Sequence, residues 1–223
     1  INRGVHEPLE EYCFQELLSR LQTESGEHTM LELGAYWGHY SLWFSKCLRK
    51  TSCVLVEPEI QNLESGKENF ANNGYSGKFI NQLVAKDAFT VDGYMQGNAS
   101  SCPEITLLHS DIQGYEEEML VSSKQTLSMK KIKYLMISTH SKKWHDTCLN
   151  IIESYDYIVE VSSEPDYHST SCDGFIFARR NDLLPIIEAD KILGRIDIAN
   201  ATAADLMRYL NKFQLVSLSD PAD

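Results

Sequence analysis

The sequence predicts an α/β fold in which a mostly parallel, seven-stranded sheet carries helices on both faces. Apolar runs of strand length alternate with segments of helical periodicity through most of the 223 residues, and this alternation is typical of parallel sheets. The first two apolar runs each end in an acid, Glu32 and Glu57, and Gly34 and Gly38 follow the first one. A strand that turns sharply into a helix through glycines is typical of nucleotide-binding sheets.

Seven apolar runs are long enough to be the strands. They are Met30–Leu33, Cys53–Val56, Phe79–Val84, a run from Ile105 to about Asp111, Ile132–Ile137, Tyr157–Val161 and Phe175–Ala178. Because helical segments separate these runs, the sheet is expected to be covered on both faces.

The helices are predicted from apolar residues at helical spacing. They are expected over Glu7–Leu21, Tyr40–Leu48, Ile60–Phe70, Tyr115–Leu120, Trp144–Ile152, Asp182–Leu193 and Ala201–Phe213. Pro58 suits the start of the third helix, since proline is tolerated in a first helical turn. The segment Thr90–Pro103 is rich in Gly, Asn and Ser, and it is expected to be a mobile loop.

The alternation of strands and helices stops after Arg180, which predicts the domain organisation. Residues 1–180 are expected to form one domain, with an N-terminal helix in 1–25 and the sheet in 26–180. Residues 181–223 are expected to be a helical C-terminal extension. Because the chain begins with Ile1 rather than methionine, it is expected to be part of a longer protein.

Charge and hydropathy argue against two classes of partner. The chain has 20 basic and 32 acidic residues and a net charge of -12. Such a surface repels phosphate, so neither nucleic acid nor an anionic membrane is expected as a partner. No apolar run approaches the roughly 18–20 residues that a membrane span needs. A small-molecule or glycan acceptor is the expected partner.

The six cysteines show no C-x-x-C spacing, which argues against a zinc knuckle or a thioredoxin-type site. Cys13, Cys47, Cys53 and Cys148 lie in apolar patterns and are expected to act as small core residues. Free thiols fit a reducing compartment, so a cytoplasmic location is expected.

The turn after the first strand predicts an adenosine-containing cofactor. Gly34 allows a close backbone approach, and the helix that follows presents its N-terminus to a ligand. Glu57 ends the second strand, where an acid accepts the hydroxyls of a ribose. Tyr36 stands where the dinucleotide fingerprint requires a second glycine, and the chain lacks the G-K-S/T of a P-loop.

Two motifs resemble a known family. Glu32-x-Gly34-x-x-x-Gly38 and Val56-Glu57-Pro58 resemble the class I S-adenosylmethionine-dependent methyltransferases. Within that class, Ser110-Asp111-Ile112-Gln113-Gly114-Tyr115-Glu116 is similar to the D-x-x-G-x-E signature of FkbM-type enzymes, as are the opening Asn2–Pro8 and Asn69-Phe70-x-x-Asn73. The resemblance covers about residues 1–180. Tyr36 departs from the Asn that many members carry.

The resemblance implies a Rossmann-like fold, S-adenosylmethionine as cofactor, and methyl transfer to a hydroxyl of a sugar, a glycan or a related natural product. It also implies which residues hold the cofactor. Glu32, Gly34 and Gly38, with Ala35 and Tyr36 of the same turn, would cradle the methionine portion. Glu57, next to Pro58, would bind the ribose, Asp87 the adenine edge, and Asp111 would border the cofactor.

Asp111 and His140 follow neighbouring strands, so they are expected to face one cleft. His140 is the predicted general base, oriented or assisted by Asp111, because an imidazole takes up a proton near neutral pH. His145 is a second catalytic candidate. Trp37, Tyr115 and Trp144 could equally wall an acceptor pocket or pack in the core.

Asp111, His140, His168 and Asp173 together could hold a divalent metal, although their spacing is not a metal signature. Two other functions stay open. One is an NAD-type oxidoreductase on a related sheet, against which the missing glycine counts. The other is a non-catalytic interaction module of a larger protein, which the helical extension keeps open.

Overall fold

Seven strands form one sheet in the order β3-β2-β1-β4-β5-β7-β6. The computed structural model describes residues 7–187 and 192–214. Strand β7 runs antiparallel to β5 and β6, whereas the other neighbouring pairs are parallel. The strands are β1 (His28–Leu33), β2 (Thr51–Val56), β3 (Lys78–Ile80), β4 (Ile105–Ser110), β5 (Ile132–Thr139), β6 (Tyr157–Ser163) and β7 (Gly174–Arg180). The prediction of a mostly parallel, seven-stranded sheet is confirmed.

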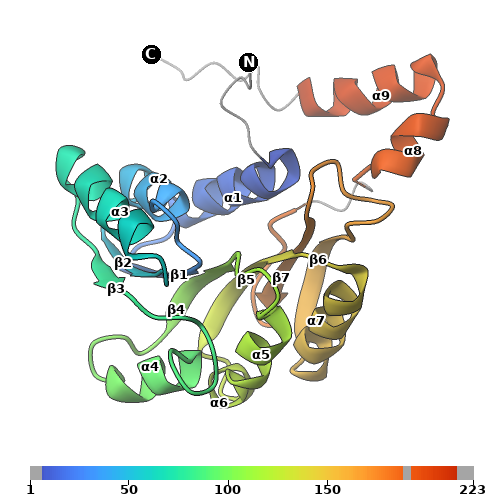
Figure 1. The fold of residues 1–223 in the computed structure, drawn as a ribbon. Coiled ribbons are helices and arrows are strands. Elements are labelled where there is room, and N and C mark those ends of the chain that lie inside the picture. Colours follow the sequence, from blue (N-terminus) through green and yellow to red (C-terminus); the bar gives the residue numbers. More distant parts are fainter. Residues whose placement is uncertain (1–6, 188–191, 215–223) are drawn as a thin grey trace.

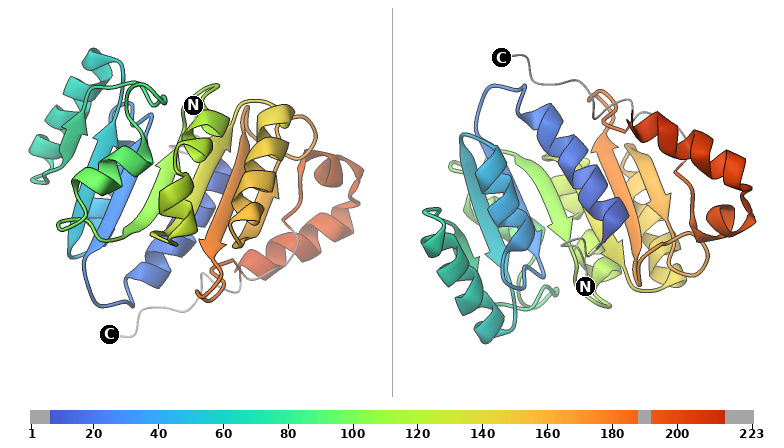
Figure 2. Two further views of the ribbon diagram at one scale, coloured as in Figure 1. Left: turned by 90° about the horizontal axis from the view of Figure 1, so that it is seen from below. Right: turned by 90° about the horizontal axis from the view of Figure 1, so that it is seen from above.

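Helices cover both faces of the sheet, as Figures 1 and 2 show. One face carries α1 (Pro8–Leu21), α2 (His39–Cys47) and α3 (Ile60–Asn72). The opposite face carries α4 (Val91–Gly97), α5 (Glu116–Val121), α6 (Lys124–Ser128) and α7 (Lys142–Ser154). The last two helices, α8 (Arg195–Asn200) and α9 (Ala203–Gln214), lie beside the β6 side of the sheet.

Each face of the sheet has its own hydrophobic core. On β1, Leu31 packs in the core under α4, α5 and α7, whereas its neighbour Met30 packs in the core under α1 and α2. The two residues have different neighbours because successive side chains of a strand point to opposite faces. Strands buried on both faces explain why the sequence shows continuous apolar runs rather than strict alternation.

The segment Thr90–Pro103 is only in part the loop that its composition predicts, since residues 98–103 are turns and irregular chain. Its first half forms helix α4, whose N-terminus is capped because the Thr90 hydroxyl oxygen accepts a hydrogen bond from the Gly93 backbone N–H. Asp92 lies in the first turn, which favours acids, and Val91 and Met95 are buried. The glycines and the asparagine lie mainly at the C-terminal end of this helix, where they suit its termination.

The prediction of a helix over Asp182–Leu193 is wrong for the described part of that segment. Residues 182–187 and 192–193 are not helical, and residues 188–191 lie outside the described residues. Pro185 lacks a backbone N–H and restricts the residue before it. The backbone N–H groups of Ile186 and Ile187 donate instead to the Glu160 carboxylate. Helix α9 confirms the last predicted helix.

Two smaller differences lie elsewhere. The third strand ends at Ile80 rather than Val84, which forms an isolated bridge with Phe89. Helix α6 was not predicted; it begins with Lys124, one of the lysines between residues 124 and 133. Of the family-like opening Asn2–Pro8, residues 2–6 lie outside the described residues.

All six cysteines are free. Cys13, Cys53 and Cys148 are buried as predicted, whereas Cys47 is half-buried. Within residues 7–187 and 192–214, none of the helices is long and apolar enough to cross a membrane.

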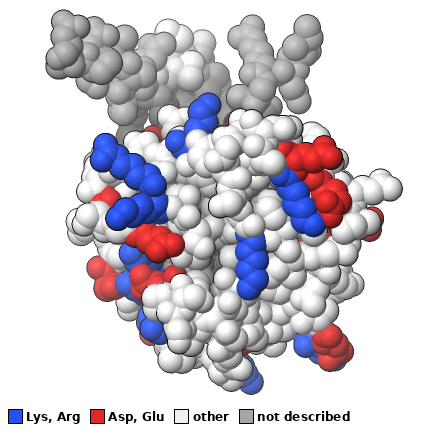
Figure 3. Space-filling view, turned by 90° about the vertical axis from the view of Figure 1, so that its left-hand side faces the viewer, with Lys and Arg blue, Asp and Glu red and all other residues white. Residues whose placement is uncertain are grey.

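Figure 3 shows the side of the molecule on which α3 and β3 lie in Figure 1. Basic and acidic side chains lie there singly or in small groups among uncharged residues. On this face the described residues offer no continuous basic surface of the kind that binds a phosphate backbone.

Candidate functional site

The turn between β1 and α2 needs glycine at two positions. A Cβ on Gly34 would lie 1.9 Å from the backbone oxygen of Asp111, so the end of β4 packs directly against the turn. A Cβ on Gly38 would lie 2.8 Å from Leu55 Cδ2, so this glycine lets α2 pack on β2. Both residues have positive φ, which glycine adopts without strain.

Glu57 fixes the shape of this turn. Its Oε2 accepts a hydrogen bond of 2.8 Å from the Tyr36 backbone N–H, and its Oε1 accepts one of 3.0 Å from the Glu59 backbone N–H. Tyr36 has a φ of 48°, which is uncommon for a residue with a side chain. The bond to Glu57 stabilises that conformation. The Tyr36 ring is half exposed beside the Trp37 ring, with 4.8 Å between their centroids.

The remaining predicted cofactor residues lie in β1 and in the segments that follow β1, β2 and β3. Glu32 is buried and accepts a hydrogen bond of 3.1 Å from the Ser41 backbone N–H, and burial raises its pKa. The Ala35 N–H donates to Val56, which ties the turn to β2. Pro58 is exposed directly after Glu57. Asp87 is exposed in a turn whose Lys86 N–H donates to the Glu118 carboxylate.

The His140 ring lies among three carboxylates. Its Nδ1 lies 2.5 Å from Glu116 Oε1, and its Nε2 lies 3.2 Å from Asp111 Oδ1 and 3.6 Å from Asp173 Oδ1. We call Asp111, Glu116, His140 and Asp173 the acidic cluster. The Glu116 side chain is fully buried, whereas 41% of the Asp111 side chain is exposed. Asp111 is therefore the member that a ligand reaches most easily.

The carboxylates change the protonation of His140. Burial alone would lower its pKa, but the hydrogen bonds to Asp111 and Glu116 and the charges of Asp111 and Asp173 outweigh burial and raise the pKa to about 10. The ring therefore carries its proton at neutral pH. Three carboxylates facing one imidazolium leave the cluster with a net negative charge.

The start of α1 adds another acid to this environment. Glu7 is buried at the N-terminus of the helix. Burial and the charges of Glu10, Asp111 and Asp173 raise its pKa to about 8. The carboxyl group therefore holds a proton at neutral pH, because burial disfavours its charged form and the neighbouring carboxylates add to that effect.

Below the cluster lies a buried pair that the sequence did not reveal. Glu10 Oε1 lies 2.6 Å from His109 Nε2, and the Ser138 hydroxyl donates to Glu10 Oε2. The Tyr40 ring packs on His109, with 4.3 Å between the centroids. The sequence offered one signal for this pair: His109 lies within the apolar run of β4, and a buried polar side chain needs a hydrogen-bond partner. The pair ties α1 to the sheet beneath Asp111.

The signature turn after β4 is shaped by Trp144. Gly114 has a φ of 88°, and a Cβ there would lie 3.2 Å from the Trp144 ring. Trp144 therefore packs over the turn that joins Asp111 to Glu116. Tyr115, which lies in the same turn, is partly exposed.

His145 lies apart from the acidic cluster. It is buried in α7, its Nδ1 lies 2.8 Å from Thr139 Oγ1, and its Nε2 lies 2.9 Å from Ser162 Oγ. Burial lowers its pKa to about 4, so the ring is neutral. Both ring nitrogens are engaged, and the geometry gives His145 no contact with the cluster.

The four metal candidates do not assemble. Asp111, His140 and Asp173 lie together, but His168 pairs with Glu164 at 3.2 Å and its side chain is 54% exposed. In the described part of the chain, no group of three or more His, Cys, Asp or Glu is arranged to hold a metal ion.

Comparison with known proteins identifies the fold. No family model and no curated protein sequence matches the chain. Solved structures do match. The precorrin-6y C5,15-methyltransferase from Geobacter metallireducens GS-15 aligns with a TM-score of 0.54 and 12% identity over 81% of this chain and 92% of that protein. TrmK from M. capricolum, in complex with S-adenosyl-homocysteine, aligns with a TM-score of 0.51 and 13% identity over 94% and 88%.

A third match is magnesium protoporphyrin IX methyltransferase from Synechocystis PCC 6803 with bound SAM. It has a TM-score of 0.52 and 10% identity over 78% of each chain. These identities are low, so the matches speak for the fold alone. The chain has the Rossmann-like fold of class I methyltransferases, as the sequence predicts.

Proposed function

We propose that this chain is an S-adenosylmethionine-dependent O-methyltransferase of the FkbM type, acting on a hydroxyl of a sugar, a glycan or a related natural product. The supporting observation is the position of the acidic cluster. The backbone of Asp111 packs against Gly34, so the cluster borders the turn that would hold the cofactor. The structural matches include methyltransferases crystallised with SAM or its product.

The residues present fit this cofactor. Each carboxylate oxygen of Glu57 accepts one backbone N–H, and a carboxylate has further lone pairs for the two ribose hydroxyls. The negative acidic cluster suits the positive sulfonium. Glu32, Gly34, Ala35, Tyr36 and Gly38 would hold the methionine portion, Glu57 and Pro58 the ribose, and Asp87 the adenine edge.

The bound cofactor supplies an electrophilic methyl group, and the protein aligns the acceptor with it. Asp111 accepts a hydrogen bond from the acceptor hydroxyl, because its side chain is the exposed one in the cluster. The hydroxyl proton becomes strongly acidic as the new carbon–oxygen bond forms, so a carboxylate suffices to receive it. Proximity and alignment provide much of the remaining acceleration.

His140 then positions Asp111. Glu116 fixes the ring through Nδ1, and Nε2 faces Asp111. Since its pKa is raised to about 10 by these carboxylates against the effect of burial, the ring stays protonated. We therefore assign the role of general base to Asp111, although the sequence favours His140. His145 and a metal have no part in this mechanism.

Cofactor binding is tested by calorimetry with S-adenosylhomocysteine. Glu57→Gln should weaken binding about tenfold or more, because hydrogen bonds to a charged group contribute roughly 1.5–3 kcal/mol. Glu59→Gln is the matched control, since Glu59 is an exposed acid two positions away. Equal affinity of wild type and Glu57→Gln would remove Glu57 from the ribose role.

Methyl transfer is tested with isotopically labelled S-adenosylmethionine and a panel of glycan and polyketide acceptors. A labelled ether product supports the proposal. Cofactor binding without transfer to any acceptor would favour the interaction module instead, and binding of a nicotinamide cofactor would favour the oxidoreductase.

A second candidate is transfer to an amine. The observation that favours it is the excess of carboxylates around the single imidazolium, with Asp111, Glu116 and Asp173 all within 3.6 Å of the His140 ring. A positively charged acceptor would offset that charge. Amine acceptors therefore belong in the same panel, and an N-methylated product would replace the O-methyl assignment.

A further inference from the structure

A cavity lies at the other end of the sheet from the acidic cluster. It has a volume of about 630 Å³ and lies at the amino ends of β1 and β2, between the C-terminal ends of α1 and α2. Pockets for small molecules have volumes of roughly 300–1,000 Å³. The turn that holds Gly34 joins the opposite ends of β1 and α2, so this cavity is separate from the proposed cofactor site.

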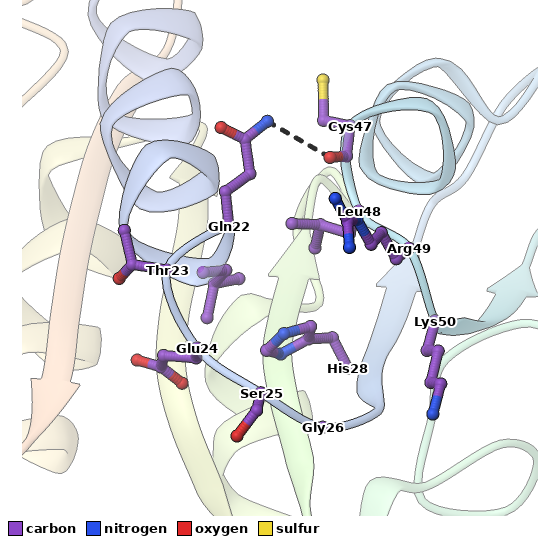
Figure 4. A pocket seen from close by; sticks show the side chains of 11 residues that line it. Gln22, Thr23, Glu24, Ser25, Gly26, His28, Cys47, Leu48, Arg49 and Lys50 are labelled. Atoms are coloured by element: carbon purple, nitrogen blue, oxygen red, sulfur yellow. Dashed lines mark hydrogen bonds between the residues drawn. The ribbon is translucent and has the colours of Figure 1, made fainter.

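Apolar side chains form part of its wall. Leu21 ends α1 and Leu48 follows α2, and both are buried. The Gln22 side chain crosses between the two helix ends and donates a hydrogen bond of 3.2 Å to the Cys47 carbonyl oxygen, as Figure 4 shows. The two helices are thus fixed relative to each other, and the cavity keeps its shape.

His28 supplies a polar group inside the cavity. It begins β1, is 5% exposed and lines the cavity. Burial lowers its pKa, although the charge of Glu24 and the nearby Leu21 carbonyl act against this effect, so the ring is neutral at neutral pH and one of its two nitrogens is an acceptor. Within residues 7–187 and 192–214, His28 Nδ1 has no hydrogen-bond partner. A buried acceptor without a partner is unusual and costly.

The charges around the cavity are positive. Arg49 and Lys50 are exposed and form no ion pair with any described residue. In Figure 4 Arg49 is directed towards the cavity and Lys50 away from it. Glu24, the acid in the lining, points outward and lies 4.0 Å from Lys133. Cations often follow helix C-termini, but that preference does not explain the buried histidine beside them.

We propose that this cavity binds a small organic acid whose body carries a hydroxyl or amino group. Its carboxylate pairs with the Arg49 guanidinium, which matches a carboxylate with two parallel hydrogen bonds. Its hydroxyl or amino group donates to His28 Nδ1, and its apolar body lies against Leu48. One inward cation balances a single negative charge, and the nearby helix C-termini disfavour a more highly charged anion such as phosphate.

The test uses 4-hydroxybenzoate as the probe, followed by amide NMR shifts of the protein. Shifts should be centred on residues 22–28 and 47–50. Two matched compounds separate the two polar contacts. 4-Hydroxybenzamide lacks the charge that pairs with Arg49, and benzoate lacks the hydroxyl that donates to His28. Each should bind about tenfold more weakly than the probe, because each loses one of the two polar contacts.

Variants show which side chains are responsible. Arg49→Ala should weaken the binding of 4-hydroxybenzoate about tenfold but leave the binding of 4-hydroxybenzamide unchanged. Lys46→Ala is the control, because Lys46 is an exposed lysine outside the lining. It should leave the affinity for both compounds unchanged. Arg49 is exposed, so the variant is expected to fold, and its amide spectrum verifies this.

Three outcomes overturn the proposal. They are the absence of shifts, equal affinity for the probe and its amide, and equal affinity of Arg49→Ala and wild type. Shifts confined to residues 32–38 and 111 would place the probe in the proposed cofactor and acceptor site, and they would overturn this proposal too. Failure here leaves the cofactor test with Glu57→Gln unaffected.

Discussion

His140 and His145 are close in sequence but lie in opposite environments. His140 follows β5 among three carboxylates, which raise its pKa to about 10 although burial opposes them. His145 lies inside α7 between two neutral hydroxyls, and burial lowers its pKa to about 4. At neutral pH one ring is charged and the other is neutral.

The comparison suggests that the type of hydrogen-bond partner distinguishes a candidate catalytic histidine from a structural one. The charged partners of His140 come from three separate segments, the residue after β4, the first residue of α5 and the residue before β7, and they meet at an edge of the sheet that ligands reach. The hydroxyl partners of His145 lie on β5 and β6, within the packed layer. The first arrangement suits catalysis, whereas the second suits structural cohesion.

The largest expected effect is on methyl transfer by His140→Gln. Loss of the imidazolium frees Asp111 from its position and leaves Glu116 without its cationic partner, so the turnover rate should fall about 10²–10⁴-fold, the usual contribution of proton-transfer groups. The rate is measured with the acceptor found in the panel. His168→Gln is the matched control, because His168 lies outside the acidic cluster. Equal losses in both variants would contradict the comparison.

The opposite result is expected for His145→Leu. An apolar side chain of similar size leaves the buried Thr139 hydroxyl without its partner, which costs roughly 1–3 kcal/mol, whereas the exposed Ser162 hydroxyl bonds water instead. The free energy of unfolding should therefore fall by about 1–3 kcal/mol, measured by urea denaturation. The turnover rate of the folded variant should stay within about twofold of wild type. A large loss of rate with unchanged stability would make His145 catalytic after all.

Stability at different pH values separates the two rings. The folded pKa of His140 is raised above its ordinary 6.5 to about 10. Its contribution is therefore complete below 6.5 and is lost as pH rises through about 10. The folded pKa of His145 is lowered to about 4, so its contribution is complete above 6.5 and is lost as pH falls towards 4.

The measurement compares each variant with wild type across this range. The stability gap between wild type and His140→Gln should close at alkaline pH, and the gap for His145→Leu should close at acidic pH. NMR titration of the ring protons gives both pKa values directly. Gaps that close in the same direction would show that the two environments are not opposite.

The sequence predicted the sheet well because apolar runs report burial directly. It also predicted that Asp111 and His140 would meet, since neighbouring parallel strands end at one edge. It did not predict the protonation of His140. That depends on Glu116 and Asp173, whose distances from the ring follow from the turn at Gly114 and from the chain before β7.

The failures have local causes. Composition predicted a loop over Thr90–Pro103, but a threonine cap and two buried apolar residues stabilise α4. Periodicity predicted a helix over Asp182–Leu193, but Pro185 and the Glu160 carboxylate favour an irregular path. His145 shows the same point for function: a histidine beside a strand end has no fixed role until its partners are known.

The smallest expected effect comes from the two hydroxyls that hold His145. Thr139 is fully buried, whereas Ser162 is exposed. Water can therefore replace the Ser162 hydroxyl on His145 Nε2, but it cannot reach Nδ1 as easily. Ser162→Ala should lower the free energy of unfolding by less than about 1 kcal/mol, and Thr139→Val by about 1–2 kcal/mol.

Urea denaturation of Ser162→Ala, Thr139→Val and His145→Leu measures these differences in the free energy of unfolding. If Ser162 acts only through the ring, adding Ser162→Ala to His145→Leu should cause no further loss of stability, because its partner is already gone. Additive losses would mean that Ser162 stabilises β6 independently of the histidine. The neutral environment of His145 would then rest on Thr139 and on burial rather than on a hydroxyl on each side.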